Sequence, residues 1–169
     1  LREVRFDVIK GNISEIAYLA EGIGTTKGVD ANLDALSTEG NLRWHTDLAR
    51  KVSTQTGAAI VISGPIDIVA DSHEAWAIRN GHPMMANITG TGCMSAGVIG
   101  CCVGAAPQAL LPSCVCAMSA MGICGELAYE KLLSVDGGSG TYRVLLMDAM
   151  SKLDGATLTR RSKAERLRI

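Results

Sequence analysis

The feature that most restricts the fold is a short apolar run near the middle of the chain. Residues 58–62 are apolar without interruption, and Ser63-Gly64-Pro65 ends the run. Such a run is typical of a strand buried on both faces, as in a parallel sheet covered by helices. Aromatic residues make up only 4% of the chain, so aliphatic side chains, Met, Cys and Ala must form the core. We therefore expect an α/β fold.

Other segments predict the elements around this strand. Residues 4–9 read as a strand, and Asn12 with Glu15 fits a capping box at the start of a helix. Asn80-Gly81 is a hairpin signal. We expect further strands at 66–70, 74–78 and 84–88, forming an antiparallel edge on the parallel sheet, and helices at 41–56, 92–103, 112–133 and 142–153. The helices at 92–103 and 112–133 are almost entirely apolar or small and are expected to be buried.

Length and charge limit the kinds of protein that this chain can be. Its 169 residues suit one core, and residues 1–169 are expected to be part of a single domain. Because Leu1 is not Met and strand-like residues follow at once, we expect a fragment of a longer protein. A formal charge of -1 offers no field to attract nucleic acid or an anionic membrane. With no leader and no uninterrupted apolar run of spanning length, a soluble, cytoplasmic protein is expected.

The charged and sulfur-containing residues have simple interpretations. Five basic residues near the C-terminus, Arg160, Arg161, Lys163, Arg166 and Arg168, read as a solvated helix face or a frayed tail. The six cysteines lie in apolar text without a C-x-x-C pair, so we expect reduced core residues and no structural metal site.

The strongest chemical signal is the segment Asn87-Ile88-Thr89-Gly90-Thr91-Gly92-Cys93, where an expected strand joins a helix through glycines. Such a turn can point backbone N–H groups and the helix dipole at an anion, and these donors would stabilise a phosphoryl group in transfer. It can equally be a tight turn that lets a helix approach a sheet. It is neither a P-loop nor a dinucleotide fingerprint.

Cys93 stands in the first turn of that helix, where the dipole favours a thiolate. The thiolate could take a proton from an incoming alcohol. From its position alone, a small buried hydrophobe like the other cysteines is the favoured interpretation.

Several motifs together resemble the hydroxyethylthiazole kinase family. They are, in order, Lys-Gly-Asn-Ile-Ser-Glu-Ile at 10–16, Lys-Gly-Val-Asp at 27–30, Ser63-Gly64 followed by Asp67, Asn-Gly-His at 80–82, and Thr-Gly-Thr-Gly-Cys at 89–93. The glycine-rich segment before Tyr142 looks like the family's closing motif. The resemblance covers most of the chain. Its most specific element is Cys93, where ribokinase-like kinases usually have Asp.

The resemblance implies a ribokinase-like α/β fold, mostly parallel with antiparallel edge strands. It also implies a homotrimer and transfer of the ATP γ-phosphate to the alcohol of 4-methyl-5-(2-hydroxyethyl)thiazole, the thiazole precursor of thiamine. By the same resemblance Gly90 and Gly92 frame the anion hole, with Gly90 also beside the substrate, and Cys93 is the base. Glu15 lies toward Mg²⁺ and Asn12 toward the phosphates, while Lys10, Ser63 and Gly64 contact ATP. The capping box remains the competing role for Glu15.

Some features depart from the family pattern. The family usually has Arg at the position of Lys10 and Thr at that of Ser63, and Pro65 replaces a commonly acidic residue. Lys10 keeps the charge but loses the bidentate geometry of Arg. The family's N-terminal part is also absent, so this chain alone is expected to be inactive. Two alternatives stay open: another ribokinase-like kinase, such as one for hydroxymethylpyrimidine, and a non-catalytic nucleotide-binding remnant.

Overall fold

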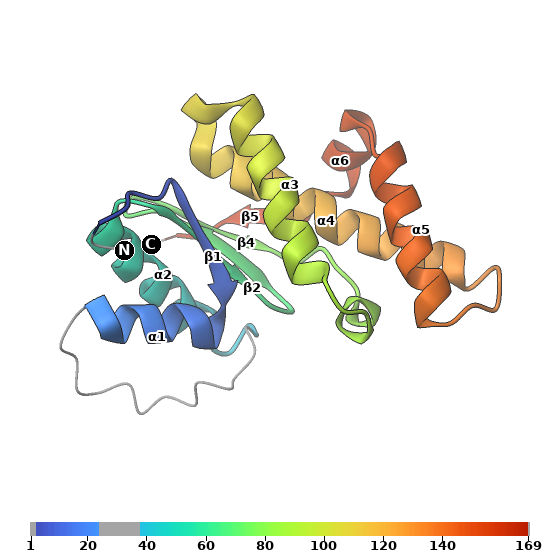
Figure 1. The fold of residues 1–169 in the computed structure, drawn as a ribbon, viewed down its shortest axis with the longest axis horizontal. Helices are drawn as coiled ribbons and strands as arrows, with labels where there is room; N and C mark the ends of the chain where they lie inside the picture. Colours follow the sequence, from blue (N-terminus) through green and yellow to red (C-terminus); the bar gives the residue numbers. More distant parts are fainter. Residues whose placement is uncertain (1–2, 24–37, 169) are drawn as a thin grey trace. The chain divides into compact units, whose positions relative to one another are not determined.

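The structure is a computed structural model that describes residues 3–23 and 38–168. Along the chain the elements are β1 (Val8–Asn12), α1 (Ile13–Ile23), α2 (Leu42–Thr56), β2 (Ala59–Ser63), β3 (Asp67–Ala70), β4 (Ala75–Ile78), the 3₁₀ helix η1 (Pro83–Asn87), α3 (Thr91–Ala105), the 3₁₀ helix η2 (Pro107–Ala109), α4 (Leu110–Leu132), α5 (Ser139–Lys152), α6 (Gly155–Arg161) and β5 (Ala164–Arg166) (Figure 1). The chain forms two compact units, residues 1–77 with 165–169 and residues 78–164.

The five strands form one mixed sheet in the order β1-β2-β3-β4-β5. β1 runs parallel to β2, with Val8 opposite Ala59 and Asn12 opposite Ser63. β2 runs antiparallel to β3. Four residues connect β3 to β4, which is too few for a parallel crossover, so this pair is antiparallel as well. The expected combination of a parallel pair and antiparallel strands is confirmed.

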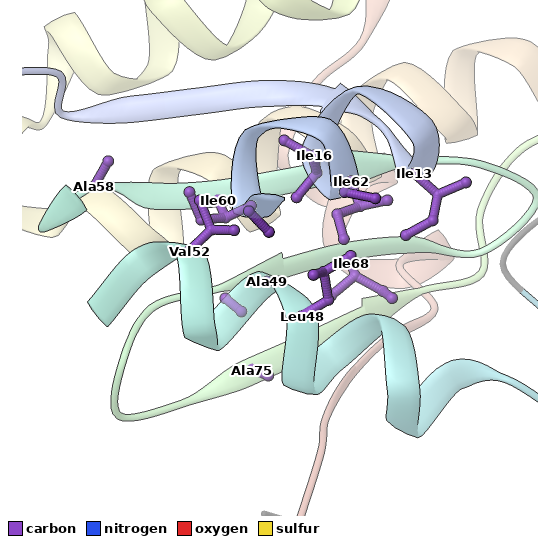
Figure 2. Close-up of a cluster of buried hydrophobic side chains, with 13 residues drawn as sticks. Ile13, Ile16, Leu48, Ala49, Val52, Ala58, Ile60, Ile62, Ile68 and Ala75 are labelled. Atoms are coloured by element: carbon purple, nitrogen blue, oxygen red, sulfur yellow. The ribbon is translucent and has the colours of Figure 1, made fainter. Parts of the chain in front are cut away.

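The core of the first unit lies between α1, α2 and one face of the strands. α1 presents Ile13, Ile16, Ala17 and Ala20 at helical spacing, and all four are buried. Figure 2 shows Ile13 and Ile16 of α1, with the labelled side chains of α2, gathered around Ile60, Ile62 and Ile68 of β2 and β3. The residues on the opposite face of the same strands, Ala59, Val61 and Val69, are also buried. The expected two-sided burial of residues 58–62 is therefore confirmed.

The N-terminal strand begins later than the sequence pattern predicted. It was expected at residues 4–9, but Val4 and Phe6 are exposed and β1 spans Val8–Asn12. The parallel pairing with β2 sets these bounds, because Ala59 is the first residue of β2 and lies opposite Val8.

The second unit is built around α4. This helix packs against α3 and α5, and its buried residues form a core with Ile88, Tyr142 and Leu146. The Tyr142 hydroxyl donates a hydrogen bond to the Gly125 carbonyl at 3.0 Å. Within the described residues, one helical stretch, Pro107–Leu132, is long and apolar enough to cross a membrane, with a mean hydropathy of 1.5. Because 61% of that window is buried inside the chain, the helix packs as a core helix does.

The strand expected at residues 84–88 is wrong, and so is the hairpin at Asn80-Gly81. Residues Pro83–Asn87 form η1 instead. His82 caps this helix, since its Nδ1 accepts a hydrogen bond from the Met84 N–H at 3.1 Å, and Pro83 has a fixed φ suited to a first turn. The His82 ring stacks on Tyr129, with ring centroids 3.5 Å apart. These contacts override the local strand propensity.

Asn80 is a buried link between distant segments of the second unit. It is 4% exposed, and its Oδ1 accepts a hydrogen bond from the Lys163 N–H at 2.7 Å. Its Nδ2 donates to the Arg161 carbonyl at 3.0 Å and to Glu126 Oε1 at 3.2 Å. The Gly81 N–H and Lys163 Nζ reach the same Glu126 oxygen, at 3.1 and 2.8 Å. Asn80 therefore joins α4 to the segment that follows α6.

The apolar helix at 92–103 is not buried as expected. α3 has only Ser95 and Ile99 buried within the chain. The cysteines are free, but Cys93 and Cys101 are exposed, so the expectation that all six lie in the core is wrong for these two. α3 packs mainly against α4 and η2.

Of the two interpretations of the basic C-terminal residues, the solvated helix face is confirmed for Arg160, and the frayed tail is not. Arg160 and Arg161 lie in the last turn of α6, and Arg161 is paired with Glu130 at 2.8 Å. Arg166 lies in β5 and is paired with Glu74 at 2.6 Å. Local patterns missed both elements, because they depend on partners far away in the sequence.

Gly122 on α4 tests the packing of the second unit. A Cβ at this position would lie 2.6 Å from the backbone of Asn80, so Gly122→Ala is expected to destabilise the chain by about 1–3 kcal/mol. Gly100→Ala on α3, which has nothing within 4 Å of its Cβ position, is the matched control and should stabilise by about 0.5–1 kcal/mol. Thermal unfolding of both variants measures this difference, and an unchanged midpoint for Gly122→Ala would contradict the packing.

Candidate functional site

The carboxyl ends of β1 and β2 gather one group of the expected site residues. The register places Asn12 opposite Ser63, and Lys10 lies two residues before Asn12. Glu15 follows in the first turn of α1. The structure therefore brings residues of two motifs side by side, although some 50 residues separate them in the sequence.

Asn12 and Glu15 form the reciprocal capping box that the sequence predicted. The Glu15 N–H donates to Asn12 Oδ1 at 2.9 Å, and the Asn12 N–H donates to Glu15 Oε2 at 2.8 Å. Gly11 permits this arrangement, since a Cβ there would lie 3.0 Å from both Cβ and Oε2 of Glu15. The box satisfies two amides at the start of α1 and holds the exposed Glu15 carboxylate at the strand end.

The segment after β2 turns sharply before β3 begins. The Asp67 carboxylate sits under this turn, with Oδ1 accepting a hydrogen bond from the Gly64 N–H at 2.9 Å. The Ser63 hydroxyl faces β1 and donates to the Gly11 carbonyl at 3.4 Å. Ser63 is half-buried and Gly64 is exposed. The turn thus presents Gly64 at the surface on top of a buried carboxylate.

Asp67 is an ionisable group in an apolar setting. Burial raises the pKa of its carboxyl from 3.8 to about 7, although the Gly64 N–H and the charge of Lys10 act in the opposite direction. Because the folded state binds this proton more tightly than the unfolded state, Asp67 lowers stability as the pH rises from about 4 to about 7. Below that range the carboxyl is neutral in both states and the penalty disappears. A carboxylate kept at such a cost is a functional candidate.

The glycine turn at the start of α3 carries the second group. Gly90 caps the helix with φ 99°, a conformation that favours glycine, and its carbonyl accepts the Met94 N–H at 2.9 Å. Thr91, Gly92 and Cys93 form the first turn of the helix. Gly92 and Cys93 are exposed. The turn therefore lies open at the surface of the second unit.

The expected site residues divide between the two units. The first unit holds Lys10, Asn12, Glu15, Ser63 and Gly64, and the second holds Gly90, Gly92 and Cys93. The Lys-Gly-Val-Asp motif at 27–30 lies outside the described residues. In the part of the chain that the structure describes, no group of three or more His, Cys, Asp or Glu side chains could hold a metal ion by itself.

Asp67 is the residue whose importance the sequence motif did not convey. It was noted only as part of the motif after Ser63-Gly64. A carboxylate directly inside a strand of otherwise apolar residues, Ile68-Val69-Ala70, was the available signal.

Comparison with known proteins gives a consistent result. A family model described as the hydroxyethylthiazole kinase family matches residues 1–156. A hydroxyethylthiazole kinase of Desulfovibrio desulfuricans is 51% identical over all of this chain and 62% of its own length. One from Clostridium acetobutylicum is 45% identical over 94% of this chain and 58% of its own length. The chain thus spans about three fifths of the length of these relatives.

The fold is shared with a solved structure. The hydroxyethylthiazole kinase structure from Pyrococcus horikoshii matches 96% of this chain and 55% of its own, with a TM-score of 0.75 and 23% sequence identity. This likeness confirms that the chain has the α/β fold of that structure, as the sequence motifs implied.

The capping box predicts different effects for two substitutions at Glu15. Glu15→Gln keeps an oxygen that can accept the Asn12 N–H, so the midpoint of thermal unfolding should stay nearly unchanged. Glu15→Ala removes the acceptor and should cost about 0.5–2 kcal/mol, as loss of a cap usually does. Equal stabilities for the two variants would show that the reciprocal bond contributes nothing.

Proposed function

Because the chain belongs to the hydroxyethylthiazole kinase family, we propose that the protein transfers the γ-phosphate of ATP to the hydroxyethyl alcohol of 4-methyl-5-(2-hydroxyethyl)thiazole. The observation that carries the proposal is the exposed glycine turn at residues 89–92, with Cys93 in the first turn of α3. An open helix start offers backbone donors for the transferred phosphoryl group, and the neighbouring thiol offers an acceptor for the proton of the alcohol. Phosphorylation of an alcohol requires both. Such a turn sealed in the core could offer neither.

In the proposed reaction the alcohol oxygen attacks the γ-phosphorus and the bond to the bridging oxygen of ADP breaks. Amides near Gly90 and Gly92 would stabilise the charge on the transferred group, since backbone donors at a helix start are fixed before the reaction begins. Cys93 would accept the proton that the alcohol loses. Positioning and electrostatic stabilisation account for most of the rate enhancement in this class of reaction.

The nucleotide would be held at the carboxyl ends of β1 and β2. Lys10 supplies a positive charge for the phosphates, and Asn12 and Ser63 supply polar side chains. Gly64 supplies exposed backbone that the nucleotide can approach closely, while its own N–H is bonded to Asp67. The departures from the family pattern act here, because Lys10 offers a point charge instead of the two-pronged contact of Arg.

Mg²⁺ would be held by Glu15 together with the phosphates of ATP. The fit is chemically reasonable, because Mg²⁺ keeps several waters and commonly takes only one or two protein carboxylates beside substrate phosphates. The cap uses Glu15 Oε2, and Oε1 belongs to the same exposed carboxylate. When bound, the ion would neutralise phosphate charge. Glu15→Gln, which keeps the cap, separates this role from the structural one by lowering Mg²⁺-dependent turnover at unchanged stability.

The proposal also includes a homotrimer in the cytoplasm. Exposed apolar side chains on the second unit, Val144 and Met147 of α5 together with most of α3, support contact with further protein.

A substrate panel tests the proposed function directly. The full-length gene product, incubated with ATP and Mg²⁺, should phosphorylate the thiazole alcohol in preference to hydroxymethylpyrimidine, with ADP release as the measurement. Phosphorylation of the pyrimidine alcohol alone would instead favour the related pyrimidine kinases. ATP binding without transfer to either alcohol would favour a non-catalytic nucleotide-binding protein.

Cys93 is expected to act on turnover and not on nucleotide binding. Cys93→Ala in the full-length gene product should lower kcat by about 10²–10⁴, the usual contribution of a general base, and leave the Kd for ATP unchanged. Cys93→Asp should preserve or raise kcat, because a carboxylate can also take the proton. Turnover of Cys93→Ala at the parental rate would show that Cys93 is not the base.

A further inference from the structure

A cavity of about 350 Å³ opens between the turn that joins β3 to β4 and the end of the last strand. His73 and Glu74 line it from the turn, and Arg166, Leu167 and Arg168 line it from β5 and the residues that follow. All five belong to the first unit. The volume is within the range of pockets that bind small molecules.

This cavity lies away from the candidate nucleotide site. β3 runs antiparallel to β2, and its last residue, Ala70, lies opposite Ile60 near the start of β2. The candidate nucleotide site includes Ser63, the last residue of β2. His73 follows Ala70 by three residues, on the far side from Ser63. The cavity and the candidate nucleotide site are therefore separate.

Hydrogen bonds hold the turn that forms the first wall. Asp71 Oδ1 accepts the N–H groups of His73 and Glu74 at 2.7 and 2.8 Å. A guanidinium nitrogen of Arg50, from α2, donates to the Ser72 carbonyl in the same turn at 3.1 Å. The turn thus has a fixed backbone, on which the exposed His73 ring is presented to the cavity.

The second wall carries an excess of positive charge. The Leu167 N–H donates to the Ala75 carbonyl at 2.8 Å, and the Leu167 side chain packs against the core. Arg166 and Arg168 stand on either side of Leu167. Arg166 Nη2 pairs with Glu74 Oε2 at 2.6 Å. Because Glu74 offsets the charge of one arginine only, the lining residues keep a net positive charge.

We propose that this cavity binds a small phosphate-bearing molecule. Guanidinium groups recognise phosphate oxygens through paired N–H donors, and the His73 ring offers a further donor. A phosphate has more acceptor oxygens and more negative charge than a carboxylate, so it suits a lining with two arginines. Leu167 supplies apolar surface for the remainder of a phosphate ester. None of these residues belongs to the proposed nucleotide site, so the inference stands apart from the proposed function.

NMR of the histidine rings in the full-length gene product tests the proposal. Titration with inorganic phosphate, at constant pH and ionic strength, should shift the His73 signals along a saturable curve. Loss of these signals in His73→Gln identifies them. Glycerol phosphate as a second ligand separates the two sources of phosphate, since tighter binding of either one identifies the preferred form. No saturable shift with either ligand, or an equal response to acetate, would overturn the proposal.

Two arginines of equal charge provide a matched pair of variants. Arg168→Gln should weaken phosphate binding about fivefold, as expected for an exposed hydrogen bond to a charged group. Arg160→Gln makes the same change of charge on α6, outside the cavity, and should leave the Kd within twofold. Both side chains are exposed, so neither substitution disturbs the core. Equal weakening by the two variants would mean attraction by overall charge and would overturn the site.

A third variant reverses the direction of the effect. Glu74→Gln removes the negative charge that competes with phosphate for Arg166, so binding should tighten about threefold. Lys10→Gln, in the candidate nucleotide site, should leave the His73 curve unchanged. Loss of the curve in Lys10→Gln would place the phosphate at the nucleotide site and contradict the proposal, whatever the outcome of the kinase assay.

Discussion

The parallel pairing of β1 with β2 is the interaction on which the first unit depends. It sets Asn12 opposite Ser63, and a shift of one residue would turn Ile60 and Ile62 away from α1 and α2. The same register brings the capping box and the Ser63-Gly64 turn to one edge of the sheet. Stability and the candidate nucleotide site therefore share one constraint, because the core that fixes the strands also fixes where their last residues lie. This agrees with the general tendency of α/β sheets to bind ligands at the carboxyl ends of their strands.

Close backbone approach is a second theme of the structure. Gly11 lets the Glu15 carboxylate fold back onto β1, and Gly122 lets α4 approach Asn80. In both places the glycine removes a Cβ that would collide with a polar group taking part in a hydrogen-bond network. Glu15 and Asn80 each join a local element to its neighbours, so the small residues around them have a steric purpose. The many glycines of the chain are thus not all turn residues.

The sequence predicted the parts of the fold that depend on local pattern. Burial and helix starts leave periodic or positional signals in a sequence. These signals predicted the apolar run at 58–62, the capping box at Asn12, and the helices α2, α4 and α5.

Prediction from the sequence failed where contacts with distant residues determine the structure. η1 depends on His82 and Tyr129, and β5 depends on strand neighbours reached only at the end of the chain. The exposure of α3 was also not predictable, because composition does not reveal which surfaces a helix can reach. For the site, motifs identified the residues at both strand ends, but the burial of Asp67 exists only in three dimensions.

The link made by Asn80 has a consequence for biosynthesis. Its partners, Arg161 and Lys163, are 81 and 83 residues further along the chain, so they leave the ribosome several seconds later at ordinary elongation rates of about 5–20 residues per second. Glu126 can already accept a hydrogen bond from Asn80 Nδ2, but the Asn80 side-chain oxygen must remain hydrated until Lys163 appears, because burying it without a donor would cost roughly 1–3 kcal/mol. Helices α3, α4 and α5 can form and pack together in the meantime. Hydrogen bonds within the segment from Asn80 to η1 are not enough to fix that segment in place. A nascent chain halted before residue 161 would therefore lack the contacts of Asn80 with Arg161 and Lys163, and the Asn80 side-chain oxygen beside α4 would stay in contact with water.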